Sequence, residues 1–480
     1  MSLSASLSNA LSGLTISSRR AEIIASNVAN ADTPGYAQRR LATTGPIPGL
    51  YSSVHVSRAA DAGLTYLRRD AAANSADAGV AQAFYTQVDL AIGDPDQAGS
   101  LQDLLSRLDA AFTSAASDPT SPAKLVLTAR AASDLASKFN DIADIVTSER
   151  RTSEGRIADS VERLNRDLAS VSRLNADIVR LKSTGNDPSD LLDQRQLIVD
   201  RIAVDIPIRE LQRDNGTIAL VSQGGVILLD GRAAEIGFSE RTYVEPDMSY
   251  PDQLSGLTVN GRNVGSGKSG DGLAGGGLGA LFRLRDDMAP RTMEQLDALA
   301  FELATRFQSP DVDPSLAAAD AGLFTDGGNP ASALALTGLA GRLAINASLD
   351  PGDSATTWRL RDGLGAVSPG PASSSAQLLR FSDVFRDSAA PAASGLGDGV
   401  DDLVGFAART RSAFSLERVA ADDAARFATN RSETLEALRD GGKVDVDEEM
   451  RRLIDVEQAY AANARLIQAV GQMMDRLTEI

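Results

Sequence analysis

Within this sequence, one glycine-rich segment comes closest to a motif that carries out chemistry. Residues 265–270 read GSGKSG, with the lysine and serine of a phosphate-binding loop. In that motif backbone N–H groups cradle the phosphates, and a glycine must stand five residues before the glycine of the GKS triplet. That position is Arg262, and Gly261 is one residue too early. We interpret the segment as a surface turn and retain a nucleotide-dependent enzyme as the alternative from a different class of protein.

Two acidic runs carry the oxygen ligands that calcium prefers. DVDP spans residues 311–314 and DGVDD spans 398–402. Pro314 breaks the spacing of an EF-hand loop, and neither run has a bidentate acid at the required distance. With no cysteine and a single histidine, His55, disulfides, thiolate metal sites and cysteine nucleophiles are excluded. No nucleophile, base and oxyanion site assemble. The sequence predicts no catalytic residue, no metal and no cofactor, and therefore a protein that is not an enzyme.

The overall charge and hydropathy narrow the classes of partner. The formal net charge is −18, from 47 Lys and Arg against 65 Asp and Glu, so a nucleic-acid partner is disfavoured. No run of about eighteen apolar residues is present, so no membrane insertion is expected. The first twenty residues lack a basic stretch followed by a continuous apolar stretch, as a cleavable secretory signal would need. We expect either a cytoplasmic protein or one exported by a route that reads no such signal.

The first helix must position the polar residues that follow it. Apolar and small residues alternate three and four apart along the N-terminal segment, with the 3.5-residue period of a coiled coil. We call them the N-terminal seam: Leu3, Leu7, Ala10, Leu14, Ser17, Ala21, Ile24 and Val28. The helix should end near Asn30, since a residue before proline is pushed out of the helical region. Thr33-Pro34-Gly35-Tyr36 suits a type II turn, because Pro sets φ at the second position and Gly supplies positive φ at the third.

The other end of the chain carries a matching pattern. Asp445 can cap a helix with Glu448 three residues on, and a helix over about 447–479 would be roughly 50 Å long. We call its apolar line the C-terminal seam: Leu453, Val456, Tyr460, Asn463, Ile467, Val470, Met474 and Leu477. Asn463 is a polar insertion of the kind that fixes helix register. The two seams are expected to pair, although an ordinary bundle core explains the periodicity equally well.

The middle of the chain alternates long helices with strand-like segments. Residues 101–115 and 122–182 are strongly helical, with a bend expected near Gly155. Beyond Ile206 short strands are expected, joined by a type I′ hairpin turn at Asn215-Gly216. Further helices are expected over 281–307 and 400–440, and RLAINASL (342–349) has the pattern of a strand.

This order predicts a nested, multidomain α+β fold. It combines a terminal α-helical coiled coil, a domain of long bundled helices, and inserted β-rich outer domains. The expected boundaries are 1–36 with 445–480 for the coiled coil; 37–205 with 280–308 and 400–444 for the helical domain; 206–279 for a β-rich insert; and 309–399 for a second β or loop insert.

The two ends also carry long ordered motifs. Leu11-Ser12-Gly13-Leu14 followed by SNVANADTPGY (26–36) resembles the N-terminal signature of the flagellar rod, hook and hook-associated proteins. DEEMRRLIDVEQAYAANARLIQAVGQMMDRL (447–477) is similar to their C-terminal block. The resemblance covers about seventy residues, and the residues that carry its turn are Asn27, Asn30, Thr33, Pro34, Gly35 and Tyr36. Val28 and Asp32 depart from the residues usual in relatives.

Within this group the chain most resembles the hook-associated protein 1 family, which forms the first hook–filament junction. Three features favour it: Thr-Pro-Gly-Tyr followed by Arg39 and Arg40, the residues DEEM at 447–450, and the helical region 101–205. A hook or distal rod subunit is the alternative within the class. A secreted adhesin or effector is a further alternative, which would not need matched terminal helices.

The resemblance implies a structural subunit of the bacterial flagellum. It implies export by the flagellar type III apparatus, a transient cytoplasmic stage, and a final extracellular position between hook and filament. Copies of the chain would form a helical layer whose terminal helices make an inner coiled-coil tube. The implied partners are the hook protein, the second hook–filament junction protein (hook-associated protein 3), further copies of the same chain, and a cytoplasmic export chaperone.

Overall fold

The chain forms two compact units that are mostly helical, with small antiparallel sheets. The computed structural model describes residues 3–44, 53–267, 272–317 and 319–478, so Lys268 and Ser269 of the glycine-rich segment lie outside the described residues. Unit 1 comprises residues 1–74, 163–235 and 428–480, and unit 2 comprises 75–162 and 236–427. The division falls within three helices, α2, α4 and α11.

Most helices of the described residues are long. Their bounds are α1 (Leu3–Ala29), α2 (Ala62–Ile92), α3 (Leu101–Ser117), α4 (Pro122–Ser183), α5 (Ser189–Asp205), α6 (Gly276–Arg283), α7 (Ala289–Gln308), α8 (Leu339–Arg342), α9 (Arg359–Asp362), α10 (Ala376–Asp383), α11 (Leu403–Asp440) and α12 (Val446–Thr478). A π-helical turn, η1 (Leu284–Met288), joins α6 to α7.

The strands are short and pair only with antiparallel neighbours. Two hairpins are formed by β1 (Arg39–Thr44) with β2 (Ser53–Arg58) and by β10 (Phe324–Asp326) with β11 (Leu343–Ile345). A four-stranded sheet has the order β3 (Ile208–Gln212), β4 (Ile218–Ser222), β5 (Ile227–Asp230) and β6 (Arg232–Ala233). A three-stranded sheet contains β7 (Ile236–Gly237), β8 (Leu257–Val259) and β9 (Arg262–Val264).

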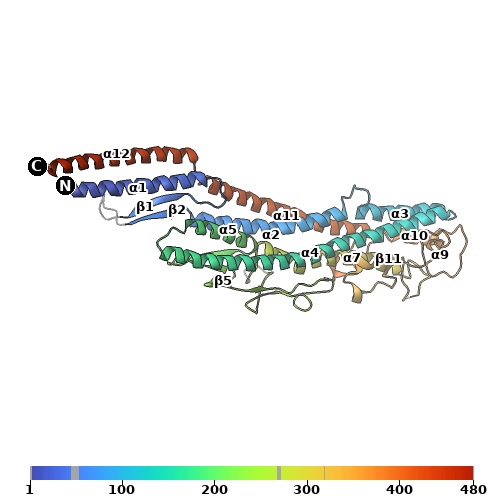
Figure 1. Ribbon diagram of the computed structural model, residues 1–480. Coiled ribbons are helices and arrows are strands. Elements are labelled where there is room, and N and C mark those ends of the chain that lie inside the picture. The colour runs from blue at the N-terminus through green and yellow to red at the C-terminus, as the bar shows by residue number, and fades with distance from the viewer. Residues whose placement is uncertain (1–2, 45–52, 268–271, 318, 479–480) are drawn as a thin grey trace. The chain divides into compact units, whose positions relative to one another are not determined.

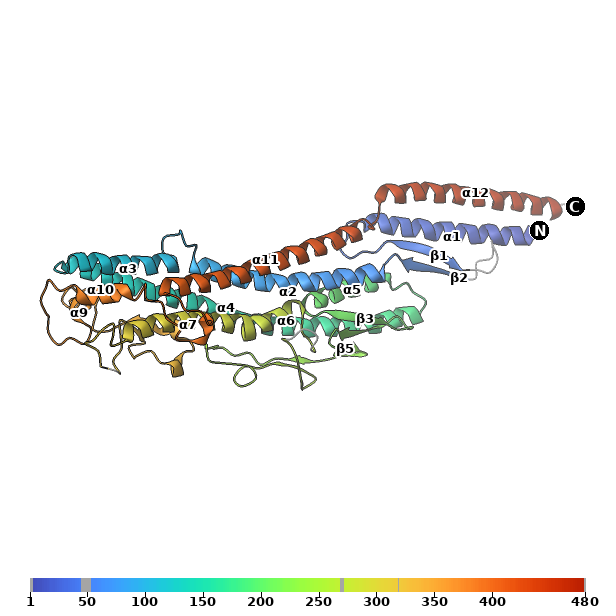
Figure 2. The same cartoon turned by 180° about the vertical axis from the view of Figure 1, so that it is seen from behind.

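In unit 1 the two terminal helices pack along each other. Figures 1 and 2 both show α1 and α12 side by side, with the two chain termini at the same end of the pair. The helices therefore run antiparallel. The Asp445 side chain accepts a hydrogen bond from the Glu448 backbone N–H at 3.1 Å, which confirms the predicted cap at the start of α12.

The rest of unit 1 packs the β3–β6 sheet on helices α4 and α5. Its core is aliphatic: Leu164, Leu168, Val171, Ile178, Val199, Ile202, Ile206, Leu220 and Leu228 are all buried. Asn175 of α4 ties the helix to the sheet, because its side chain donates to the Ile218 carbonyl at 2.9 Å and accepts from the Ile218 N–H at 3.2 Å.

Unit 2 has an aromatic core. The rings of Phe112 in α3 and Phe381 in α10 lie 5.3 Å apart, and Phe307 at the end of α7 contacts both, as well as Phe324 of β10. Since aromatic pairs contribute beyond the area that they bury, this cluster is the point at which α3, α7, α10 and β10 are fixed to one another.

Several local expectations are confirmed, and others are wrong. The α1 helix ends at Ala29 and α4 begins at Pro122, as the sequence predicts. The turn after β3 is not type I′: Asn215 has no positive φ, Gly216 has a φ of +88°, and β3 pairs with β4 from Gln212↔Ile218. A type I′ turn needs positive φ at both central residues, so the loop instead closes through the N–H of Gly216 on the Arg213 carbonyl.

The helix boundaries also differ from expectation in places. Helix α4 continues without interruption through Gly155. The helix expected over 281–307 begins earlier, at Gly276. Within RLAINASL only Leu343–Ile345 is a strand, because Arg342 ends α8. Helices α2 and α5 were not individually foreseen. Among the described residues, no helix combines the length and apolar content that crossing a membrane requires.

Candidate assembly site at the terminal helices

A buried asparagine joins the end of α1 to three other segments of unit 1. Asn27 is 1% exposed. Its amide nitrogen donates to a Glu449 carboxylate oxygen at 3.1 Å and to the Arg39 carbonyl at 3.0 Å. Its amide oxygen accepts from the Arg39 N–H at 3.0 Å and from the Tyr36 hydroxyl at 2.9 Å. Both donors and both lone pairs of the amide are thus used, which holds α1, the turn, β1 and α12 together.

Glu449 is the matching buried group on α12. It is 1% exposed, and besides Asn27 it accepts from the Gln38 amide at 2.8 Å and from Arg452 at 2.8 Å. A buried carboxylate is costly unless it is hydrogen-bonded and paired, and here all three donors are in place. Residues at the two ends of the sequence therefore meet in one polar cluster. We call Asn27, Tyr36, Gln38, Arg39 and Glu449 the terminal polar cluster.

The turn that follows α1 has the geometry that its sequence predicts. The Tyr36 N–H donates to the Thr33 carbonyl at 3.1 Å, and Gly35 has a φ of +80°. A Cβ atom at Gly35 would lie 2.6 Å from the Leu197 side chain of α5. Glycine is therefore required here both by the backbone angle and by the space. At Gly35 the turn therefore packs against α5.

Ion pairs fix the strand after the turn to α5 as well. One guanidinium nitrogen of Arg39 lies 2.5 Å from Asp190 and 3.4 Å from Asp193, and Arg58 of β2 also pairs with Asp193. The Arg39 guanidinium lies over the Tyr36 ring, 4.8 Å from its centre. Burial raises the pKa of the Tyr36 phenol, so the hydroxyl stays protonated and can donate to Asn27 at neutral pH.

A second close approach sets the register of α1 against α12. A Cβ atom on Gly13 would lie 2.6 Å from the Asn463 side-chain nitrogen. The same interval of fourteen residues separates Gly13 from Asn27 on α1 and Glu449 from Asn463 on α12. This equal spacing is what an antiparallel pair requires, and fourteen residues are two heptads, or four turns of 3.5 residues.

The predicted seam residues differ in how far the single chain covers them. Ala10, Ser17, Ile24, Val456 and Val470 are buried. Seven more are half-buried: Leu7, Leu14, Ala21, Val28, Leu453, Asn463 and Ile467. Tyr460 and Met474 are each 49% exposed. The side chains of Leu3 and Leu477 lie outside the described part.

Helix α12 carries several large apolar side chains with little cover. Met450, Ile454, Leu466 and Met473 are each about half exposed, as are Tyr460 and Met474 of the seam, and Leu11 of α1. Scattered exposed apolar residues are ordinary, but such a concentration along one helix is typical of an interaction surface. Pairing of α1 with α12 thus leaves apolar surface for a further partner.

The sequence patterns identified only part of this site. The signature residues Asn27, Asn30 and Tyr36 do lie together, since Asn30 donates to the Ser26 carbonyl at 2.9 Å and accepts from Thr33 at 3.3 Å. Thr33 and Pro34 are exposed. Gln38 and Glu449 were not predicted as site residues, and the available signal was their polarity beside apolar seams. The described residues contain no cluster of His, Cys, Asp and Glu that could hold a metal ion.

Comparisons with known proteins agree with the geometry at the termini. Residues 7–36 match a family described as flagella basal body rod protein, and 441–480 match the C-terminal family of flagellar basal body rod FlgEFG proteins. Residues 85–310 match the helical domain of flagellar hook-associated protein FlgK.

Curated relatives at low sequence identity are named flagellar hook-associated protein 1. Flagellar hook-associated protein 1 of Salmonella typhimurium is 24% identical over 323 residues, covering 64% of this chain and 56% of the relative. The protein of that name from Bacillus subtilis is 21% identical over 498 residues, covering 94% of this chain and 93% of its own length. The chain thus spans little more than half the length of the Salmonella relative. The solved structure of the flagellar hook junction protein FlgK from Burkholderia pseudomallei aligns with a TM-score of 0.43 and 18% identity, over 55% of this chain and 47% of that one.

The matches at both ends place the chain among the flagellar rod, hook and hook-associated proteins. The helical-domain match and the named relatives then decide between these groups. Together these matches support the identity of the chain as a member of the flagellar hook-associated protein 1 family, also called the FlgK family.

Proposed function

We propose that this protein is a structural subunit joining the flagellar hook to the filament, assembled through its terminal helices. The observation that carries the proposal is the α1–α12 pair, which the terminal polar cluster holds in register while apolar side chains on α12 remain exposed. A helix pair that is complete in itself would not leave those side chains in water. Copies of the same chain, packed around a common axis as a coiled-coil tube, would cover them.

The polar cluster has a definite part in this proposal. It supplies directional contacts at one end of a helix pair whose interface contains Ala, Ser, Gly and Asn and so buries little apolar area. The N-terminal half of α1 and the C-terminal half of α12 lie far from that anchor along the helices. They are the parts that neighbouring subunits would stabilise most.

The family implies further steps, which we include in the proposal. The chain is exported by the flagellar type III apparatus with a cytoplasmic chaperone, reaches an extracellular position, and contacts the hook protein on one side and hook-associated protein 3 on the other. No enzymatic activity is proposed. The match to the helical domain over 85–310 favours a hook-associated subunit over a hook or distal rod subunit.

The test is amide hydrogen exchange of the purified monomer compared with subunits added to hooks isolated from the same bacterium. We expect α1 and α12 to exchange quickly in the monomer, with protection strongest near Asn27 and Glu449, and to become protected along their whole length on the hooks. Complete protection already in the monomer would show that α1 and α12 form an ordinary bundle core and would contradict the proposal.

A pair of glycine variants sharpens the test. Gly13→Val forces a side chain into Asn463, whereas Gly79→Val, also within a helix, meets no atom within 4 Å. We expect Gly13→Val to reduce co-sedimentation with hooks strongly and Gly79→Val to leave it near the wild-type level. Equal binding by both variants would show that the α1–α12 register is not needed for attachment.

A further inference from the structure

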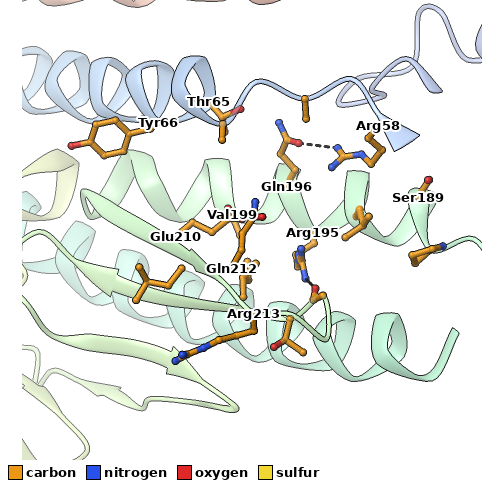
Figure 3. A pocket seen from close by; sticks show the side chains of 18 of the residues that line it. Arg58, Thr65, Tyr66, Ser189, Arg195, Gln196, Val199, Glu210, Gln212 and Arg213 are labelled. Atoms are coloured by element: carbon orange, nitrogen blue, oxygen red, sulfur yellow. Dashed lines mark hydrogen bonds between the residues drawn. The ribbon is translucent and has the colours of Figure 1, made fainter. Parts of the chain in front are cut away.

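A cavity of about 830 Å³ opens within unit 1, and none of the residues of the terminal polar cluster lines it. It lies between the start of α2, helix α5 and strand β3, as Figure 3 shows. Thr65 and Tyr66 line it from α2, and Arg195, Gln196 and Val199 line it from α5. This space is large enough for several residues of an extended peptide.

The lining of this cavity is basic, although the whole chain is acidic. Its charged side chains are the cations Arg58, Arg69, Lys182, Arg195, Arg209 and Arg213 and the carboxylates Asp187 and Glu210. The chain as a whole has a net charge of −18. A cluster of cations in a concave site focuses a positive potential even when the rest of the surface is negative.

Three of these cations lack a carboxylate partner. Arg58 pairs with Asp193, Arg69 pairs with Asp200, and Arg213 pairs with Asp230. No ion pair among the described residues involves Lys182, Arg195 or Arg209. The positive charge of the cavity is therefore only partly neutralised.

Arg195 is the buried member of these three. It is 8% exposed, and one guanidinium nitrogen donates at 2.8 Å to the side-chain oxygen of Asn175 and to the Gly216 carbonyl. Both acceptors are neutral. Burial lowers the pKa of Arg195 to about 10. A buried cation of this kind is stabilised by an anion that enters the site.

Strand β3 presents an open edge to the same cavity. It is the first strand of its sheet and pairs only with β4. Two backbone hydrogen bonds, from the Arg213 N–H to the Thr217 carbonyl and from the Gln223 N–H to the Pro207 carbonyl, show which residues of β3 bond to β4. In an antiparallel pair, alternate residues bond inward, so Glu210 and Gln212 direct their N–H and C=O groups outward. Among the described residues no partner reaches these groups.

The edge and the charges belong to one surface. Every residue from Ile208 to Arg213 lines the cavity, whichever face of the sheet its side chain belongs to. Only the edge of the strand can expose all of them to one space. A bound chain that extended the sheet there would meet Arg195, Lys182 and Arg209 with its side chains.

We propose that this cavity binds an extended, acidic segment of a partner polypeptide, which adds to β3 as an antiparallel or parallel strand. Backbone bonds to Glu210 and Gln212 would supply affinity, and carboxylates on the segment would neutralise Arg195, Lys182 and Arg209. The occupant is defined by its chemistry, an extended backbone with closely spaced carboxylates. This surface is separate from the helix pair used in the proposed function.

The test uses the full purified chain and three fluorescent hexapeptides. One alternates valine and aspartate, the second alternates valine and lysine, and the third is the acidic peptide with alternate backbone nitrogens methylated. We expect measurable binding by fluorescence anisotropy for the first peptide only, weakening as salt is raised. Amide exchange at Glu210 and Gln212 should slow when it binds.

Charge variants locate the contact. Arg195→Gln should weaken binding of the acidic peptide about tenfold, as loss of a buried charged hydrogen bond does. The exposed Lys182→Gln and Arg209→Gln should each weaken it about threefold. Arg232→Gln is the matched control, because Arg232 is an exposed arginine of the same sheet that does not line the cavity. If Arg195→Gln unfolds the chain, Lys182→Gln and Arg209→Gln still test whether the cations of the cavity bind the acidic peptide.

Several results would overturn the proposal. Equal binding of the lysine peptide would remove the role of charge, and equal binding of the methylated peptide would remove strand addition. If inorganic phosphate slows amide exchange at the cavity and no peptide binds, the cavity is a small-anion site instead. No binding of any peptide would show that the charges on β3 only protect an open edge from aggregation. None of these results bears on hook attachment, since hooks are absent from the experiment.

Discussion

At the scale of single residues, the terminal helices depend on a few fully used polar groups. Asn27 is within one turn of the end of α1, and Glu449 is in the first turn of α12. Between them they form hydrogen bonds with Tyr36, Gln38 and Arg39, all within the twelve residues that follow Asn27. Since Asn27, Gln38 and Glu449 are buried, removal of one leaves the others without a partner, and this makes the cluster a sensitive place to test.

We expect Glu449→Gln to destabilise the α1–α12 pair by about 1–3 kcal/mol, because the amide turns one acceptor oxygen into a donor that faces other donors. Denaturant unfolding and amide exchange of α12 measure the loss. Glu457→Gln is the matched control, since Glu457 is an exposed glutamate of the same helix. A similar loss in both variants would mean that only the helix charge matters and not the cluster.

A buried acid in unit 2 predicts a pH dependence. Asp297 of α7 is 1% exposed and accepts from the Gly338 and Ala340 N–H groups at 2.6 and 2.8 Å. Burial raises its pKa to about 6 from an ordinary 3.8. Between these values the folded state binds more proton than the unfolded state, so the free energy of unfolding should fall as pH rises through this window, by about 3 kcal/mol.

Asp297→Asn should remove this dependence between pH 4 and 6. Unfolding by urea across that range, followed by the fluorescence of Trp358 in unit 2, gives the measurement. Asp311→Asn changes an exposed aspartate of the same unit and serves as the control. If the wild type and Asp297→Asn have parallel pH profiles, Asp297 does not titrate in this window.

At the scale of elements, local chemistry was predictable and distant contacts were not. The Pro34-Gly35 turn and the Asp445 cap depend on neighbours a few residues away, and both were predicted from the sequence. The pairing of Asn27 with Glu449 spans 422 residues, and no local pattern specifies it. Helix α2 was missed because its alanine-rich stretch has little apolar periodicity to indicate a helix. The turn at Asn215-Gly216 was assigned wrongly because the strand register, and not the dipeptide, sets the loop length.

The turn after α1 gives a prediction at this scale. Gly35→Ala places a methyl group in a positive-φ position and against Leu197, whereas Gly185→Ala places it at a φ of +77° with no atom within 4 Å. We expect a loss of about 1–2 kcal/mol for Gly185→Ala from backbone strain alone. Gly35→Ala should lower the free energy of unfolding by the same amount for strain and by about 1–3 kcal/mol more for the overlap with Leu197. Equal losses by thermal or denaturant unfolding would show that α5 yields freely and does not fix the turn.

At the scale of the whole molecule, nesting was visible in the sequence because matching patterns stood at both ends. The basic cavity of unit 1 was not visible, since its cations come from β2, α2, α4, α5 and the β3–β4 hairpin and form no run in the sequence. Composition records only their sum, which is strongly negative. A local excess of one charge therefore requires the folded chain to be seen.

That net charge of −18 bears on assembly, since copies packed side by side repel one another. Raising the salt concentration from about 0.01 to 0.15 M shortens the screening length from about 30 to 8 Å, so attachment of successive subunits to hooks should become faster. Light scattering after mixing measures the rate. Sucrose is the control, because it favours burial of surface without screening charge. A rate that falls with salt would mean that attraction between opposite charges at the contact outweighs the repulsion, and the exposed apolar side chains of α12 would then not be the main contact.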